Sequence, residues 1–80
     1  MLKQLAFVKF KTNQLETSLD LYRKILDQDQ GDVDSYFYQG EVYRYLGRTN
    51  LALESYRVYL ELYPESPLKD KVESYINSMK

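Results

Sequence analysis

The sequence predicts an all-α protein of five helices, arranged as two helix-turn-helix repeats followed by one further helix. Apolar residues recur with a period near 3.6 along the whole chain, and no segment alternates in the manner of a strand. Shifting the chain by 34 positions aligns residues 18–27 with residues 52–61, where four of ten positions are identical and two more exchange Asp for Glu. So close an internal match indicates a structural repeat. The expected helices span residues 2–12, 15–29, 33–46, 50–63 and 67–79.

The boundaries of the first repeat follow from residues that end or begin helices. Asn13 separates the first two helices and is one of the few residues that tolerate the left-handed backbone conformation of a helix end. Gly31 interrupts the chain between the repeats, and Asp32 or Asp34 can cap the helix that follows. Ala6 and Ser18 are small enough to let the two helices of this repeat cross closely.

The second repeat carries the same signals more clearly. Gly47 stands 34 positions after Asn13 and predicts a helix end of the same kind. Thr49 is placed to cap the fourth helix. Gly40 and Ala52 are the small residues at the expected crossing of the third and fourth helices. Pro64 closes this repeat.

The fifth helix is expected to cap the array. Ser66 and Pro67 predict its start, as a capping residue followed by a proline in the first helical turn. Its apolar positions form one stripe that can pack on the second repeat while the remainder faces water. These positions are Leu68, Val72, Tyr75, Ile76 and Met79. The chain is therefore interpreted as a single domain over 1–80, with repeat one at about 1–32, repeat two at about 33–66 and the capping helix at about 67–79.

The composition argues against several classes of function. The 80 residues contain no cysteine and no histidine, so disulfides, thiolate metal sites and the usual general base are excluded. A formal net charge of −1 offers no basic footprint for nucleic acid. The nine tyrosines are read as packing residues, with phosphorylation or base stacking left open.

Targeting signals and membrane spans are not expected. Lysines at positions 3 and 9 interrupt the apolar N-terminal segment, and no small-residue cleavage site follows it. The longest uncharged stretch falls well short of the roughly 20 residues that a membrane span needs. We expect a cytoplasmic protein without membrane insertion, or a periplasmic one if an export signal has been removed.

An acidic cluster marks the turn between the repeats and is the best candidate for a cation site. It comprises Asp27, Asp29, Asp32 and Asp34. Its spacing is similar to part of a calcium loop, but the position of the bidentate glutamate is occupied by Tyr38. We therefore expect no metal and no cofactor. Since no nucleophile constellation or phosphate loop is present either, we do not expect an enzyme.

The second repeat resembles the tetratricopeptide repeat family. The resemblance rests on Tyr36, Gly40, Tyr43, Gly47, Ala52, Tyr56 and Pro64. The sequence departs from the family pattern at Tyr36, where the family has tryptophan, and at Gln39, where it has leucine. The first repeat keeps the phase but few of the signature residues. The resemblance implies a right-handed α-α superhelix, in which the first helix of each repeat lines a concave face that binds peptides.

Carried over by phase, the resemblance places a set of side chains on that concave face. The set is Lys3, Phe7, Phe10, Lys11, Phe37, Glu41, Arg44, Tyr45, Lys71 and Tyr75, with Asp34, Leu68 and Met79 at its margin. Within it, Phe7, Phe37 and Tyr75 are expected to form an exposed aromatic ladder, which is typical of an interface. The alternative is that Phe7 and Phe10 belong to the core. The family's clamp for a terminal carboxylate fits poorly, because Phe7 and Glu41 replace its asparagines.

Several functions follow as hypotheses. The first is a scaffold that binds an apolar peptide or partner helix, with an acidic flank, on its concave face. The second is self-association as a homodimer, because the apolar side chains of Met1, Leu2 and Leu5 lack a polar cap and so short an array buries little. The third, nucleic-acid binding, is favoured only by the tyrosines. A fourth hypothesis is that the chain is a fragment of a longer repeat protein, since residues 62–67 resemble the junctions of bacterial envelope-associated members of the family.

Overall fold

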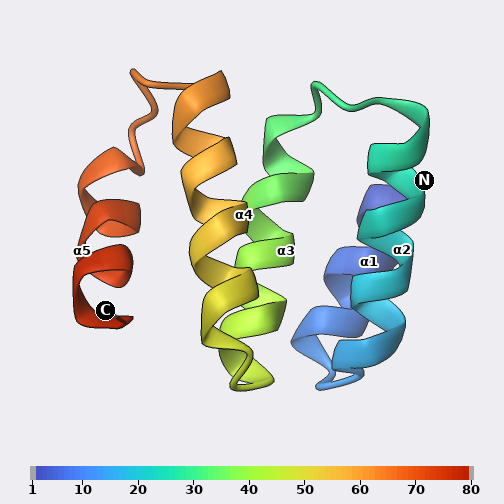
Figure 1. Cartoon of the computed structure of the whole chain (residues 1–80). Coiled ribbons are helices and arrows are strands. Elements are labelled where there is room, and N and C mark those ends of the chain that lie inside the picture. Colours follow the sequence, from blue (N-terminus) through green and yellow to red (C-terminus); the bar gives the residue numbers. More distant parts are fainter. Residues whose placement is uncertain (1, 80) are drawn as a thin grey trace.

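The computed structural model describes residues 2–79 and contains five α-helices (Figure 1). They are α1 (Leu2–Lys11), α2 (Leu15–Gln28), α3 (Val33–Tyr45), α4 (Thr49–Leu62) and α5 (Lys69–Met79). No strand occurs in this part of the chain. The expected all-α fold of five helices is confirmed, with helix ends that differ from the predicted ones by no more than two residues.

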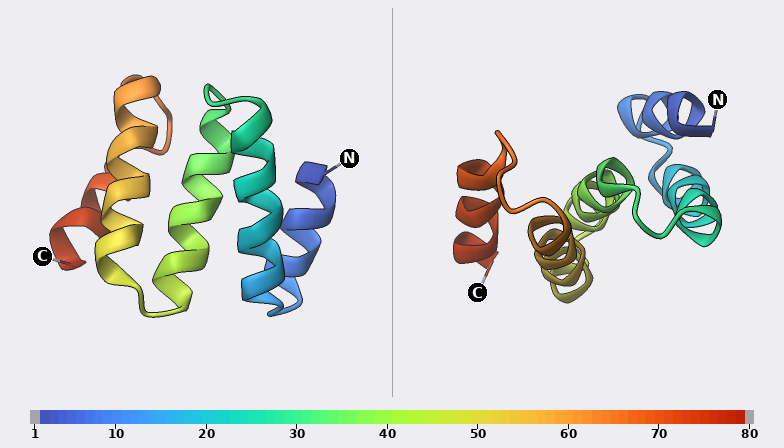
Figure 2. Two further views of the ribbon diagram at one scale, coloured as in Figure 1. Left: turned by 45° about the vertical axis from the view of Figure 1, so that its right-hand side comes forward. Right: turned by 90° about the horizontal axis from the view of Figure 1, so that it is seen from above.

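Each helix packs on the next, so that the chain forms a short solenoid. Seen from above in Figure 2, α1 and α3 lie toward one side of the array, α2 and α4 toward the other, and α5 stands at the end beside α4. Side chains of α3 contact both α1 and α5. The surface formed by α1, α3 and α5 is called the inner face below.

The ends of α1 and α3 have the same construction, as the repeat predicts. Asn13 and Gly47 both adopt left-handed backbone, with φ of 65° and 76°. In each turn the amide of the following residue donates to a carbonyl five positions back, and the left-handed residue donates to one three positions back. This pair of bonds satisfies carbonyls that would otherwise be left free at a helix end.

The helix starts follow the predictions less closely. The Asp32 side chain accepts a hydrogen bond from the Ser35 amide at 3.4 Å and caps α3 as expected. The prediction for Thr49 is wrong, because Thr49 is already the first residue of α4 and Arg48 holds the capping position without a side-chain bond. Helix α4 therefore begins one residue earlier than the sequence suggests.

The segment before α5 is fastened by Ser66. Its hydroxyl accepts a hydrogen bond from the Leu68 amide at 3.0 Å and lies 2.5 Å from the buried hydroxyl of Tyr59. Pro67 was expected in the first turn of the helix, but it lies in the turn that precedes Lys69. Val72 is fully buried and anchors α5 to the array.

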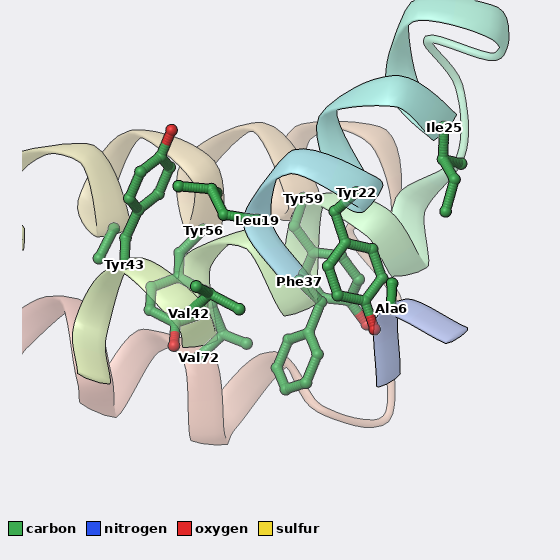
Figure 3. Packing of buried hydrophobic residues seen from close by; sticks show 11 residues of the cluster. Ala6, Leu19, Tyr22, Ile25, Phe37, Val42, Tyr43, Tyr56, Tyr59 and Val72 are labelled. Atoms are coloured by element: carbon green, nitrogen blue, oxygen red, sulfur yellow. The ribbon is translucent and has the colours of Figure 1, made fainter. Parts of the chain in front are cut away.

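The core runs through all five helices and is shown in Figure 3. Small residues let the paired helices approach, as predicted. The Ser18 hydroxyl donates to the carbonyl of Ala6 at 2.7 Å inside the first pair. In the second pair, a Cβ added to Gly40 would lie 2.8 Å from the ring of Tyr56. Only glycine permits this packing of α3 on α4.

Candidate functional site

The structure brings the predicted site residues to the inner face but gives them unequal exposure. Five are exposed, three are half-buried and two are buried. The exposed residues are Lys3, Phe7, Lys11, Tyr45 and Lys71, the half-buried ones are Phe10, Arg44 and Tyr75, and the buried ones are Phe37 and Glu41. At the margin, Asp34 and Leu68 are exposed, while the side chain of Met79 lies outside the described part.

The expected aromatic ladder is wrong at its central member. Phe37 is only 7% exposed, because it packs between Tyr38 and Tyr59 with ring centroids 5.2 and 5.5 Å away. A small rotation of α3 about its axis turns this position from the open face into the core, and the 3.6-residue period cannot resolve such a rotation. Phe7 remains 37% exposed, so the alternative that places it in the core does not hold for this residue.

Tyr38 stands at the centre of the aromatic contacts, although no sequence pattern predicted it as a site residue. Its ring stacks on Tyr22 at 5.6 Å and meets Phe7, Phe10 and Phe37 at 5.4, 6.2 and 5.2 Å. The corresponding position of the first repeat carries Gln4, so neither repeat marks it as special. Tyr38 joins the inner face of α1 to that of α3.

A cavity of about 260 Å³ opens on the inner face between α1 and α3. It is lined by Lys3, Gln4, Phe7, Tyr22, Asp34 and Tyr38. The aromatic rings form its walls, and an ionic cluster lies at its edge, where the Lys3 ammonium is 2.9 Å from Asp32 and 3.8 Å from Asp34. The hydrogen bond to Asp32 raises the pKa of Lys3 above its ordinary value.

Tyr56, Glu41 and Arg44 form a hydrogen-bonded network on the inner face of the second repeat. The Tyr56 hydroxyl donates to Glu41 at 2.5 Å, and Arg44 donates both to that hydroxyl at 3.3 Å and to Glu41 at 3.2 Å. Burial and the hydrogen bond to Glu41 raise the pKa of Tyr56 well above its usual range. These bonds explain why a glutamate predicted on the open face can be buried.

The first repeat has the same tyrosine without the network. Tyr22 occupies the position of Tyr56 one repeat earlier and is 1% exposed, yet its hydroxyl has no hydrogen-bond partner in the described part of the chain. The positions that carry Glu41 and Arg44 in repeat two carry Phe7 and Phe10 in repeat one. Since phenylalanine offers no acceptor or donor, the hydroxyl beneath the cavity is left unbonded.

A second feature crosses the inner face near the ends of α1 and α3. Three cations and three aromatic rings form a continuous series of contacts there, which is called the cation–aromatic row. They are Lys11, Phe10, Tyr45, Arg44, Tyr75 and Lys71.

Every neighbouring pair of the row is in contact. The Lys11 ammonium lies 5.7 Å from the Phe10 centroid, which is 5.4 Å from the ring of Tyr45. The Arg44 guanidinium lies 4.8 Å from Tyr45 and 4.2 Å from Tyr75. The row therefore joins α1 and α3 directly to α5, where the Lys71 ammonium lies 5.8 Å from the Tyr75 ring.

The described residues contain neither a metal-ligand group nor a membrane-spanning helix. Between residues 2 and 79, no group of three or more Asp or Glu side chains is placed to hold a metal ion. The best cation candidate, the acidic cluster near the turn, instead supplies Asp32 to a helix cap and to Lys3. None of the helices over the same residues is long and apolar enough to cross a membrane.

Comparisons with known proteins agree with this architecture. A sequence profile of the tetratricopeptide repeat matches residues 34–66. The solution NMR structure of a tetratricopeptide repeat domain protein from Salinibacter ruber is similar with a TM-score of 0.81 and 21% identity, over 96% of this chain and 81% of that one. A crystal structure of a tetratricopeptide repeat domain protein from the same organism has a TM-score of 0.72 and 26% identity, over 96% and 85%.

A search of curated protein sequences found no match. The repeat profile covers the second helical pair, and the fold relatives extend the likeness across nearly the whole chain. The likeness to these structures spans both helical pairs, which repeat after 34 positions, and extends into α5. Residues 34–66 match the tetratricopeptide repeat, and the chain as a whole shares the fold of tetratricopeptide repeat domain proteins.

Proposed function

We propose that this chain is an interaction module that binds a protein segment on its inner face, with one apolar or aromatic side chain inserted between α1 and α3. The observation that carries the proposal is the cavity of about 260 Å³, whose walls are aromatic and whose lining includes the polar side chains of Lys3, Gln4 and Asp34. Concave, mostly apolar sites with a few polar groups are the usual form of a binding pocket.

The chemistry of the cavity favours a particular kind of side chain. The rings of Phe7, Tyr22 and Tyr38 offer apolar surface and edges for aromatic contacts. The Tyr22 hydroxyl is fully buried and is not reached from the cavity, whereas the polar side chains of Lys3, Gln4 and Asp34 line it and offer hydrogen bonds. An inserted tyrosine, tryptophan or glutamine meets both requirements, because each combines an apolar body with a polar tip.

Replacement of Phe7 by alanine tests the proposal. Phe7 is 37% exposed, so its loss should leave the fold intact, whereas Phe37→Ala would open a hole in the core. A library of random peptides, displayed on phage and selected on the wild-type protein, supplies the probe. We expect the selected peptides to bind Phe7→Ala at least about tenfold more weakly, as for a central interface residue.

Leu62→Ala is the control. Leu62 is an exposed apolar residue, at 48%, that lies on α4 and does not line the cavity. Peptides that bind both variants equally well would place the binding surface elsewhere and overturn the proposal.

A second function, association of two copies through α1, is favoured by a difference between the repeats. Leu5 and Val8 are 45% and 52% exposed, while the counterpart of Val8 in repeat two, Val42, is fully buried. This face of α1 therefore lies where a preceding repeat would pack. At the other end, the corresponding surface of α5 carries polar, exposed residues, Asp70, Ser74 and Asn77. Two copies can pair through their apolar α1 ends, which gives a closed dimer. Head-to-tail stacking would place the apolar end of one copy on the polar end of the next and is less favourable.

Sedimentation velocity over a range of concentrations tests this second function. The wild-type chain should form a dimer that Val8→Glu converts to a monomer, while Asn77→Glu at the opposite end should change nothing. A wild-type chain that sediments as a monomer at every concentration rules out the pairing.

A further inference from the structure

We infer that the segment bound on the inner face is acidic, and that its carboxylates lie along the cation–aromatic row. The inference rests on the proposed function and adds to it the charge and the orientation of the partner. It follows from the positions of the six side chains of the row and from the carboxylates that surround them.

The two lysines of the row form no salt bridge. Within residues 2–79, no carboxylate lies within 4.0 Å of Lys11 or Lys71, whereas Lys3, Arg44 and Arg48 are paired. Both are exposed, and each lies over an aromatic ring. The rings attract the cations to the inner face without neutralising them, so the positive charge stays available to a partner.

Arg44 presents a free edge of its guanidinium between two rings. Its Nε and one terminal nitrogen donate to Tyr56 and Glu41, while the other terminal nitrogen has no partner in the described part of the chain. The Arg44 side chain is 27% exposed and the Glu41 side chain only 10%. A partner therefore meets the guanidinium and not the carboxylate, and a planar guanidinium suits a carboxylate oxygen well.

The helix ends reduce the local positive charge only in part. Lys11 and Arg44 lie in the last turns of α1 and α3, where backbone carbonyls carry partial negative charge. Amides of the two left-handed turns already donate to carbonyls of these last turns. Half a charge at each end, screened within one turn, does not offset two whole lysine charges.

The opposite end of the inner face has the opposite sign. There Lys3 is paired with Asp32 and lies near Asp34, so one cation faces two carboxylates. The apolar cavity lies at this end, because Lys3 and Asp34 line it. A segment with its anchoring side chain in the cavity and its acidic residues toward the ends of α1 and α3 matches both charges.

Single-stranded nucleic acid would also use rings and cations, but the chain suits it less well. A bound strand brings one phosphate with every base, and binding relies on a positively charged groove. The chain as a whole has a formal charge of −1, and the row offers only two uncompensated lysines. An acidic protein segment, with carboxylates only where the cations lie, is the better match.

The experiment compares the charge of peptides selected from one random displayed library on three proteins. These are the wild-type chain, the double variant Lys11→Gln with Lys71→Gln, and a control Lys24→Gln, whose exposed lysine lies on α2. We expect acidic peptides to be enriched on the wild type and the control but not on the double variant. A selected acidic peptide should bind about three- to tenfold more tightly than the same peptide with every Asp and Glu replaced by Gln. This difference in affinity should decrease as the salt concentration rises.

The outcomes separate the inference from the proposed function. Enrichment of apolar peptides without an excess of acids overturns the acidic preference and leaves inner-face binding in place. Failure to enrich any peptide on the wild type overturns inner-face binding itself. Binding of a labelled oligo-dT strand that is tighter than that of the peptides, and lost in the double variant, overturns the inference in favour of nucleic acid.

Discussion

The Tyr56 hydroxyl donates a 2.5 Å hydrogen bond to Glu41, while the hydroxyl of Tyr22, one repeat earlier, has no partner. The two tyrosines are equally buried, at 0% and 1% exposure. They differ only in what the neighbouring inner helix offers, a bonded carboxylate in one repeat and apolar rings in the other. The hydroxyl of Tyr56 therefore contributes a hydrogen bond to the fold, whereas the hydroxyl of Tyr22 is buried without one.

Removing the two hydroxyls in turn should therefore have opposite effects on stability. Tyr56→Phe leaves Glu41 and Arg44 with one bond fewer in a buried place and should lower the free energy of unfolding by about 1–3 kcal/mol. Tyr22→Phe removes an unbonded buried group and should leave that free energy unchanged or slightly higher. Urea unfolding followed by circular dichroism measures both. A larger loss for Tyr22→Phe would show that its hydroxyl is bonded in solution.

The same two tyrosines predict a loss of stability at alkaline pH. Burial raises the pKa of both, and for Tyr56 the bond to Glu41 adds to the effect, from an unperturbed value of 10.0. Because the folded chain holds these protons more tightly than the unfolded chain, stability is fully present below about pH 10 and falls as the pH rises above it. Unfolding in urea at successive pH values should show the fall.

The double variant Tyr22→Phe with Tyr56→Phe is the control for the alkaline effect, and its stability should decline less steeply above pH 10. A titration in which all nine tyrosines of the folded protein ionise together near the unperturbed value would contradict the prediction. Ultraviolet absorbance of tyrosinate follows that titration.

Asp32 combines a helix cap with an ion pair, and two substitutions can separate the roles. Its side chain accepts from the Ser35 amide and lies 2.9 Å from the Lys3 ammonium. Asp32→Ala removes both interactions and should cost about 1–2 kcal/mol, mostly from the cap. Asp32→Asn keeps a capping acceptor and should cost only about 0.2–1 kcal/mol. Thermal unfolding of the two variants, at low and at high salt, gives the comparison, and equal losses would refute it.

Gly40 is expected to tolerate no side chain. A methyl group there would lie 2.8 Å from the buried ring of Tyr56, which cannot turn away without disturbing the core. Alanine would gain up to about 1 kcal/mol in helix propensity, but overpacking costs about 1–3 kcal/mol, so Gly40→Ala should destabilise the chain. Gly31→Ala is the control, since its Cβ would meet only a side-chain oxygen at 3.6 Å. A gain of stability for Gly40→Ala, measured in urea, would contradict the packing.

The boundaries of the helices could be predicted because they depend on neighbouring residues. Asn13 and Gly47 end helices through their own backbone conformation, and Asp32 caps α3 through an amide only three residues away. The prediction for Thr49 failed by one residue, since Arg48 holds the capping position and Thr49 is the first residue of α4.

The candidate site was predicted less completely because exposure depends on the rotation of each helix against its neighbours. Phe37 and Glu41 were expected on the open face, yet both are buried against α4, one by ring packing and one by bonds to Tyr56 and Arg44. Tyr38 carried no signal in either repeat, although it contacts four aromatic rings.

The sequence by itself determined the all-α fold, the repeat and the set of side chains near the inner face, because helix period and turn chemistry act over a few residues. Only the tertiary structure decided which of those side chains remain open. It buried Phe37, left the hydroxyl of Tyr22 unbonded beneath a cavity and brought Arg44 between the rings of Tyr45 and Tyr75. The physical reason is that these contacts join residues from different helices, and a rotation of a few tens of degrees, invisible in the period, exchanges core for surface.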